Sequence, residues 1–455
     1  MLQRFHQLRR WAGVDRAIFF TLLSRVWGVF SGPVTIYLIA RFLTRDEQGY
    51  FYTFGSVLGL RVFFELGLGY VIMQSVSHEM AHLQWSEQGT IVGDPGAKAR
   101  LASLLRFALK CYITLAVIGA GVLLPAGLWF FNTSPADGAA ILWRIPWLVV
   151  VIMTSFDLIL TPFYGLLEGS GKVAEYAKRN VWMAVVSSLC FWICLSLGGK
   201  LYSAPIQNAT CAVIGAFWVF VKYGRCFKDL LATPIPPGGA ISWKDDLFHF
   251  QWKIALTSLS GYFIFQFINP VLFRYRGPAE AGRMGMSLKI IDILSNFAYS
   301  WVSTKAAPFG TYIARREFDR LDRVFRQAAR QSIAVHLAGG LAFFAGYYAL
   351  RHFGVAVAFR FLDPLPLVFL YFNALITCMV FCLAIYLRAH RQEPLLVNSL
   401  VVAALISVAV LTVGPRFGAD GIAVALFVIN LAVSLPWVAW VFYTKRRQWH
   451  APDGI

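Results

Sequence analysis

Long apolar segments separated by short polar turns run through this chain from residue 18 onward. Most hold about 18 to 25 residues, enough for a helix to cross a hydrocarbon core about 30 Å thick. The alternation typical of a transmembrane barrel is absent from the sequence. The pattern predicts twelve membrane-spanning helices, at residues 18–40, 49–74, 102–131, 142–167, 180–198, 204–223, 250–273, 285–309, 332–350, 365–387, 395–413 and 420–443.

Composition agrees with this pattern. The 455 residues are 58% hydrophobic and only 14% charged, whereas a soluble domain carries about 25% charged residues. We therefore expect an all-α polytopic membrane protein.

The formal net charge of +18 comes from basic residues that recur between the apolar segments. Alternate connecting segments are rich and poor in Lys and Arg, as the positive-inside rule requires. The count predicts that both termini lie in the cytoplasm. Because no single basic patch forms, we expect no nucleic-acid partner.

A proline-rich loop, with Pro234, Pro236 and Pro237, divides the predicted spans into six plus six. It predicts an N-terminal lobe at residues 1–228, a cytoplasmic linker at 229–248 and a C-terminal lobe at 249–455. The turns at residues 44–49 and 277–282 occupy matching places in the two halves. Such internal repeats are typical of transporters with a central site.

Two further expectations concern helix geometry. The basic segment 315–331 is interpreted as an amphipathic helix on the cytoplasmic face. Prolines inside spans predict kinks where neighbours or water satisfy the freed carbonyls. These are Pro33, Pro162, Pro270 and Pro308.

Three ionisable residues lie well inside the first two predicted spans: Arg25, Arg61 and Glu65. A charge at that depth is costly, so it usually faces a bundle interior or a water-filled cavity. Arg61 and Glu65 are one helical turn apart and could neutralise each other. In that case Arg25 is the remaining cation.

Further charges lie in later spans. Lys289 and Asp292 form an equivalent pair in the eighth span, and Asp157 is the most isolated acid. Lys253 and Lys305 lie in the seventh and eighth spans, and with them basic groups outnumber acids. This balance favours an anionic ligand, and guanidinium matches phosphate oxygens well. We predict that Arg25, Arg61 and Lys289 bind substrate and that Glu65, Asp157 and Asp292 couple transport to protons or sodium.

Enzymatic chemistry has little support. H-E-x-x-H, G-x-S-x-G and Walker motifs do not occur in the sequence. His78 and His82 have the i,i+4 spacing of a metal pair but lack a clear third ligand, and the seven cysteines form no C-x-x-C motif. We therefore expect a transporter that needs no cofactor and no metal.

At the opening hairpin the chain resembles the Wzx-type flippases of the multidrug/oligosaccharidyl-lipid/polysaccharide (MOP) superfamily. The matching stretches are Ser24-Arg25-Val26-Trp27-Gly28, Ala40–Tyr50 and Glu65-Leu66-Gly67-Leu68-Gly69, with looser agreement at residues 165–172, 278–282, 315–330 and 418–421. The resemblance implies about twelve helices in two six-helix lobes around a central cavity, as in MATE transporters. Related lipid II flippases have an arginine that corresponds to Arg25.

The resemblance also implies a function. The substrate would be an undecaprenyl-pyrophosphate-linked oligosaccharide, a repeat unit of O-antigen, capsule or exopolysaccharide, flipped across the bacterial inner membrane. A polysaccharide polymerase and other assembly proteins would be partners. Two alternatives remain open: a MATE-like multidrug or cation antiporter, and a membrane-embedded glycan polymerase or ligase.

Overall fold

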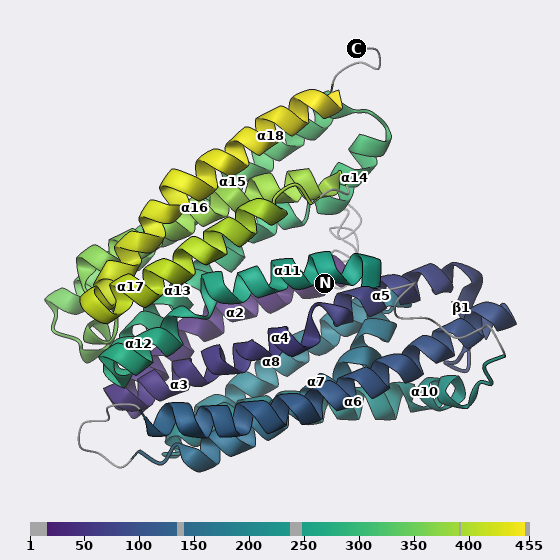
Figure 1. Cartoon of the computed structure of the whole chain (residues 1–455), viewed down its shortest axis with the longest axis horizontal. Coiled ribbons are helices and arrows are strands. Elements are labelled where there is room, and N and C mark those ends of the chain that lie inside the picture. The colour runs from purple at the N-terminus through teal and green to yellow at the C-terminus, as the bar shows by residue number, and fades with distance from the viewer. Residues whose placement is uncertain (1–15, 134–140, 237–247, 391–392, 451–455) are drawn as a thin grey trace, which may run out of the picture. The chain divides into compact units, whose positions relative to one another are not determined.

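The computed structural model describes residues 16–133, 141–236, 248–390 and 393–450. Nine helices in these ranges are long and apolar enough to cross a membrane, or ten if the bent pair Arg45–Glu65 and Leu68–His82 is one span. The prediction of an all-α polytopic membrane fold is confirmed (Figure 1). Residues 237–247, which make up most of the predicted linker 229–248, lie outside the described residues. So do Arg4, Arg9 and Arg10 of the N-terminus that was predicted to be cytoplasmic.

Contacts divide the chain into two compact units. Among the described residues, the first contains 16–27, 58–132, 141–236 and 248–259, and the second contains 28–57, 133, 260–390 and 393–450. The first two predicted spans therefore contribute residues to both units.

The first unit is a helical bundle with one short β-hairpin. Its elements are the start of α2 (Arg16–Phe42), η1 (Gly59–Arg61), α4 (Val62–Glu65), α5 (Leu68–Glu79), η2 (Met80–His82), β1 (Leu83–Trp85), β2 (Ile91–Gly93), α6 (Pro95–Asn132), α7 (Arg144–Gly169), α8 (Val173–Ser196), η3 (Lys200–Tyr202), α9 (Ser203–Phe217), η4 (Trp218–Lys222), α10 (Tyr223–Ala232) and most of α11 (Phe248–Phe265). Strands β1 and β2 pair antiparallel, with Leu83 opposite Gly93. The core packs around α6 and α7, where Tyr112 and Trp147 are fully buried.

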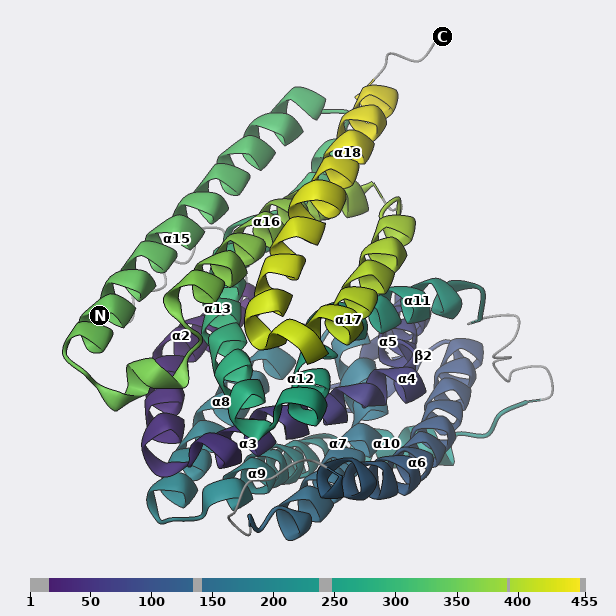
Figure 2. The same ribbon diagram turned by 60° about the vertical axis from the view of Figure 1, so that its left-hand side comes forward.

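The second unit has its core between long helices. It contains the rest of α2, α3 (Arg45–Leu58), α12 (Ile268–Arg276), α13 (Pro278–Ser303), α14 (Ala306–Ala314), α15 (Phe318–His352), η6 (Ala356–Arg360), α16 (Pro364–Ala389), α17 (Leu396–Ile429), η7 (Asn430–Ser434) and α18 (Leu435–His450). Figure 2 shows α16, α17 and α18 beside one another, as their contacts also indicate. Gly418 kinks α17 with a φ of 63°, at the turn between the last two predicted spans.

Two of the four prolines predicted to cause kinks, Pro270 and Pro308, follow a helix break by four residues. They lie in the first turns of α12 and α14, and the α-helical hydrogen bonding is interrupted before each, around Gln266 and Thr304. A proline removes the hydrogen bond to the carbonyl four residues earlier, which is where each break occurs. Pro33 and Pro162, in contrast, lie inside continuous helices.

The predicted surface helix at 315–331 is wrong as a separate element. Residues from Phe318 onward belong to α15, one continuous helix of 35 residues that also contains the ninth predicted span. Neither glycine nor proline interrupts residues 318–338, so the basic segment simply extends the apolar helix. A change of composition does not end a helix unless a residue breaks its hydrogen bonding.

The two turns that were predicted to correspond, at residues 44–49 and 277–282, meet inside the second unit. Gln48 donates a 2.8 Å hydrogen bond to the Gly282 carbonyl. A Cβ atom on Gly49 would overlap the Pro278 carbonyl oxygen, and one on Gly282 would lie 2.8 Å from the Gly49 nitrogen. Only two glycines allow backbones to approach this closely.

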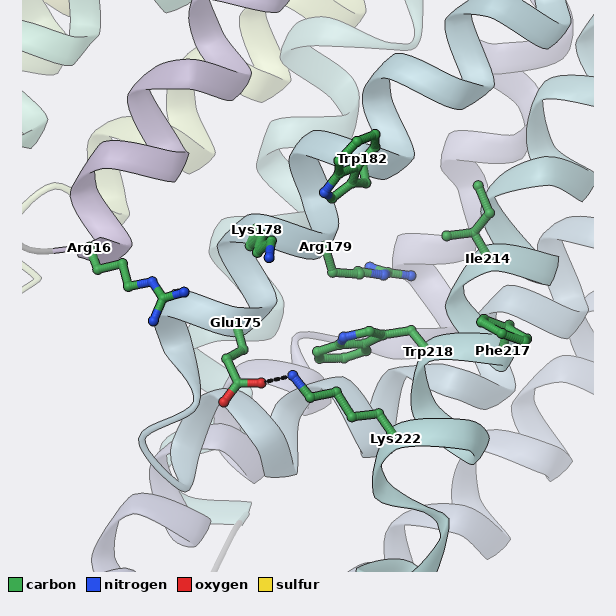
Figure 3. Close-up of a pocket in the computed structure, with 9 residues that line it drawn as sticks. All are labelled: Arg16, Glu175, Lys178, Arg179, Trp182, Ile214, Phe217, Trp218 and Lys222. Carbon is green, nitrogen blue, oxygen red and sulfur yellow. Dashed lines mark hydrogen bonds and ion pairs between the residues drawn. The ribbon is translucent and has the colours of Figure 1, made fainter. Parts of the chain in front are cut away.

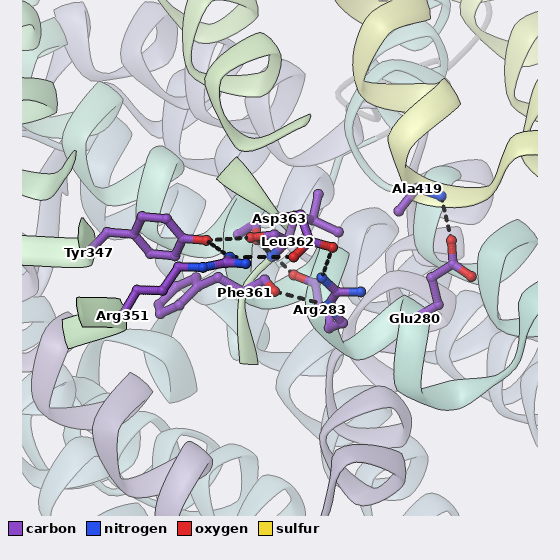
Figure 4. Close-up of polar contacts among 9 residues, drawn as sticks. Glu280, Arg283, Tyr347, Arg351, Phe361, Leu362, Asp363 and Ala419 are labelled. Carbon is purple, nitrogen blue, oxygen red and sulfur yellow. Dashed lines mark hydrogen bonds and ion pairs between the residues drawn. The ribbon is translucent and has the colours of Figure 1, made fainter. Parts of the chain in front are cut away.

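An ionic cluster joins the helix ends of the second unit (Figure 4). Arg283 of α13 donates to Asp363 at 2.8 Å and to the Phe361 carbonyl at 2.9 Å. Arg351 of α15 reaches Asp363 at 3.4 Å and the Tyr347 hydroxyl at 2.9 Å. Asp363, just before α16, therefore connects three helices.

This cluster predicts a pH dependence. The hydrogen bond from Arg283 holds the pKa of the Asp363 carboxyl below its ordinary value, so its contribution to stability is present at neutral pH and is lost as pH falls through the folded-state pKa. We expect Asp363→Asn to lower stability at pH 7 by about 1 kcal/mol or less, because the side chain is half-exposed. Thermal unfolding of the purified protein at pH 7 and at about pH 3.5 should show the gap between wild type and variant narrowing in acid. If the difference in unfolding temperature between wild type and Asp363→Asn widened in acid, the ionised Asp363 carboxylate would not be the stabilising group.

Candidate functional site

A break in the second predicted span creates the first part of the site. Helix α4 ends at Glu65, and Leu66 and Gly67 both have left-handed backbone, with φ of 47° and 71°. Helix α5 then continues at a bend of 49° between the two segments. Broken helices in membranes occur where protein or a cavity satisfies the freed backbone groups.

The carboxylate of Glu65 sits at this break. Its Oε1 atom accepts a 3.0 Å hydrogen bond from the hydroxyl of Tyr112 on α6. Whether Arg61 and Glu65 neutralise each other stays open, but no direct ion pair joins them among the described residues. The reason is geometric, since Arg61 lies in the 3₁₀ turn η1 and is exposed, whereas Glu65 faces α6.

The second part of the site is a chain of three polar side chains from α7 and α8. Tyr164 donates to the Asp157 carboxylate at 3.5 Å, and Arg179 donates to the Tyr164 hydroxyl at 2.7 Å. Asp157 is therefore not the isolated acid that was predicted. Through Tyr164 it is linked to a cation.

That cation was missed as a site residue. The predicted spans 142–167 and 180–198 leave Arg179 in the connection between them, but it is part of α8 and is only 5% exposed. Its guanidinium lies 4.2 Å from the centre of the Tyr164 ring, and Nη1 donates to Asn180 at 3.1 Å. Gly215 of α9 makes room, because a Cβ atom there would overlap both Tyr164 and Arg179.

A signal for Arg179 was present in the sequence. Residues 173–179 contain neither glycine nor proline, so the helix predicted from residue 180 has no reason to begin there. Extending it upstream places Tyr176 and Arg179 one turn apart. The apolar pattern alone could not reveal this, because the basic residues look like a polar connection.

The two arginines predicted to bind substrate also belong to this unit. Arg25 lies on α2 and is half-buried. Two residues later, Trp27 donates a 3.2 Å hydrogen bond to the Ala184 carbonyl of α8, which fixes this part of α2 against α8. Arg61 acts electrostatically on Asp157 and on Tyr112. The first unit therefore holds both acids, and Asp157 interacts electrostatically with two guanidinium groups, those of Arg179 and Arg61.

A pocket of about 620 Å³ opens beside Arg179 (Figure 3). Figure 3 shows Arg179 pointing from α8 toward Ile214 of α9. The complete lining is Arg16, Glu175, Lys178, Arg179, Trp182, Ile214, Phe217, Trp218 and Lys222. Basic and aromatic side chains thus predominate in a single concave surface.

The remaining predicted site residues, Lys289 and Asp292, lie on α13 of the second unit. Both are exposed, as is Asn296, which donates to the Asp292 carbonyl at 2.8 Å. Their spacing places the three on one side of the helix. Whether this side and the arginines of the first unit act on one substrate stays a prediction.

The histidines at 78 and 82 have a structural setting. Glu79, between them, pairs with Arg100 of α6 at 2.9 Å, and His82 ends η2 just before the β-hairpin. Over the described ranges, no group of three or more His, Cys, Asp or Glu side chains could hold a metal ion.

Comparison with known proteins identifies the fold. No family model matches the chain, and no curated protein matches its sequence. An inward-facing multidrug resistance MATE transporter of the MOP superfamily has a TM-score of 0.65 at 15% identity, with 96% of each chain covered. The lipid II flippase MurJ, in an inward closed conformation, has a TM-score of 0.64 at 12% identity, covering 94% of this chain and 88% of MurJ.

A third similar structure is a MOP superfamily transporter from Pyrococcus furiosus, described as having a binding pocket of reversed polarity that suggests a different function. Its TM-score is 0.57 at 14% identity, with 96% of each chain covered. At these identities the likeness establishes a shared fold, that of MOP superfamily transporters.

Proposed function

We propose that this protein is a flippase that moves an undecaprenyl-pyrophosphate-linked oligosaccharide from the cytoplasmic to the periplasmic leaflet of the bacterial inner membrane. The substrate would be a repeat unit of O-antigen, capsule or exopolysaccharide, delivered to a polysaccharide polymerase. The shared fold with both a lipid II flippase and multidrug transporters supports membrane transport. The choice of an anionic lipid-linked substrate rests on the charges of the site.

One observation supports an anionic substrate: both acids of the first unit already have hydrogen-bond partners within the protein. Glu65 accepts a hydrogen bond from Tyr112, and Asp157 is linked through Tyr164 to Arg179. Arg25 and Arg61 add two further guanidinium groups to the same unit. A surplus of guanidinium favours an anion, and its planar fork matches phosphate oxygens in a bidentate manner.

In this mechanism the cavity alternates between the two faces of the membrane. Arg25 and Arg61 neutralise the pyrophosphate while the polyprenyl tail remains in the bilayer, because burying the diphosphate without cations would be too costly. Lys289 supplies a cation from the second unit. The sugars then cross with the pyrophosphate, shielded from lipid.

Binding of a proton or sodium ion would return the empty transporter to the state that is open to the cytoplasm. Asp157 and Glu65 each accept a hydrogen bond from a tyrosine hydroxyl. Asp292 on α13 is the candidate in the second unit. Transport by reconstituted protein that is indifferent to imposed pH and sodium gradients would remove these three acids from the mechanism.

The proposal predicts that Arg25→Ala and Arg61→Ala reduce surface glycan at matched protein levels. Loss of one charged hydrogen bond to phosphate weakens binding by about 1.5–3 kcal/mol, or roughly 10- to 100-fold. Lipid-linked repeat units should accumulate on the cytoplasmic leaflet. Quantifying surface glycan in a strain that lacks the endogenous flippase measures this directly.

Lys110→Ala is the matched control, because Lys110 is an exposed basic residue on α6 of the same unit and has no predicted role. It should leave surface glycan unchanged. Wild-type glycan in both arginine variants would overturn the cation site.

The second candidate function is a MATE-like multidrug or cation antiporter, favoured by the carboxylates Glu65 and Asp157 and by the multidrug transporters of the same fold. It predicts that the chain confers resistance to toxic cations and that Arg61→Ala leaves this resistance intact. A glycan polymerase or ligase would instead leave lipid-linked repeat units on the outer leaflet when the gene is deleted.

A further inference from the structure

We propose that the pocket beside Arg179 binds the phosphate-bearing headgroup of an anionic membrane lipid. It is called here the α8–η4 pocket, lined by the nine residues given above. Its volume of about 620 Å³ lies in the range of small-molecule sites. This binding does not depend on the proposed flippase activity.

The charge of the pocket favours an anion. Four basic side chains line it, from Arg16, Lys178, Arg179 and Lys222, against the single carboxylate of Glu175. That carboxylate is already engaged, since it pairs with Lys222, accepts a 2.6 Å hydrogen bond from Tyr223 and lies 3.6 Å from Lys172. Positive charge therefore remains in excess around the opening.

Arg179 is the buried donor at this site. It is 95% buried, and its Nε–H group has no hydrogen-bond partner among the described residues, although Nη1 and Nη2 are both bonded. A buried, unpartnered donor on a charged group is costly. A phosphate oxygen in the pocket would satisfy it with a charge-assisted bond.

The rim of the pocket is suited to a lipid rather than to a soluble anion. Trp182 is 59% exposed and Phe217 is 67% exposed, and amphipathic aromatic rings prefer the headgroup level of a bilayer. Neighbouring positions on α9 and η4 add exposed apolar side chains, those of Val213, Phe220 and Val221. These provide a surface for acyl or polyprenyl chains.

Basic pockets between transmembrane helices on the cytoplasmic side bind lipid headgroups through the same combination of cations and apolar walls. Lys178 and Arg179 belong to a segment predicted to lie toward the cytoplasm. Two sources share this chemistry: a phospholipid such as cardiolipin, and a polyprenyl pyrophosphate.

The test measures lipid binding by the purified full chain, by native mass spectrometry with cardiolipin, with geranylgeranyl pyrophosphate and with inorganic pyrophosphate. Removing one cation near the headgroup should weaken binding about fivefold, so Lys178→Glu, which also adds an opposing charge, should weaken it by more. Arg179→Lys keeps the charge but loses the planar fork, and should weaken binding without removing it.

Lys228→Glu is the matched control, since Lys228 is exposed on α10 of the same unit but does not line the pocket. Preference for cardiolipin or for geranylgeranyl pyrophosphate identifies the source of the phosphate, and either result supports the site. Equal lipid binding by Lys178→Glu and Lys228→Glu would overturn it, as would binding of inorganic pyrophosphate alone. Surface glycan is measured separately, so failure here is distinguishable from failure of the flippase proposal.

Discussion

Replacing Arg179 with alanine is expected to destabilise the protein by about 3 kcal/mol and to lower its unfolding temperature markedly. The substitution removes the 2.7 Å hydrogen bond to Tyr164 and the stacking of the guanidinium on that ring at 4.2 Å. A hydrogen bond to a charged group contributes about 1.5–3 kcal/mol, and a desolvated cation–π contact about 2 kcal/mol. Thermal unfolding of detergent-purified protein, followed by tryptophan fluorescence, measures the change.

The comparison variants are on the same helix. Lys178→Ala removes an exposed neighbouring cation and should change stability by less than about 0.5 kcal/mol. The loss of stability in Arg179→Lys should fall between these two, because lysine keeps the charge but lacks the planar fork that bonds Tyr164 and Asn180. If Arg179→Ala unfolds at the temperature of Lys178→Ala, the link from Asp157 through Tyr164 does not stabilise the unit.

A second large effect is expected at the contact of the two glycine turns. In Gly49→Ala the new methyl group overlaps the Pro278 carbonyl oxygen, which is backbone and cannot rotate away. Overpacking of a well-filled region costs about 1–3 kcal/mol, and we expect Gly49→Ala at the upper end of that range. Gly282→Ala should cost less, since its Cβ atom would lie 2.8 Å from the Gly49 nitrogen and 3.1 Å from the Arg45 carbonyl oxygen.

Gly55→Ala provides the control on the same helix, α3, because nothing lies within 4 Å of a Cβ atom there. Alanine favours helix over glycine by up to about 1 kcal/mol, so this variant should unfold at or above the wild-type temperature. The double variant Gly49→Ala/Gly282→Ala should cost less than the sum of the single changes, because both separate the same pair of backbones. Strict additivity would mean that the two glycines do not share one contact.

The helical class and the places of most spans could be predicted, because hydrophobic length reports directly on membrane crossing. The correspondence of the turns at 44–49 and 277–282 stays a prediction, and the sequence could not reveal that Gly49 and Gly282 touch. Helix breaks were predicted only where proline causes them. The left-handed pair Leu66–Gly67 was missed, because leucine carries no signal for positive φ.

The candidate site was predicted in part. Glu65 and Asp157 were found as charges in apolar segments, but their partners Tyr112 and Tyr164 were not, because tyrosine is common in such segments. Arg179 was hidden for the opposite reason, since a basic residue at the end of a span usually lies in a polar connection. A charged residue inside an apolar segment can be recognised from the sequence. The side chain that bonds to it cannot, because that depends on how the helices pack.

The assignment of residues 28–57 to the second unit has a consequence for biosynthesis. Their partners, among them Phe273, Gly282 and Arg360, are translated only after the last residue of the first unit. Membrane insertion of the opening hairpin and completion of its packing must therefore be separate events in time. A gene split at the proline-rich loop would yield an N-terminal fragment that carries a structural segment of its partner, so that co-expressed fragments should assemble by donating that segment.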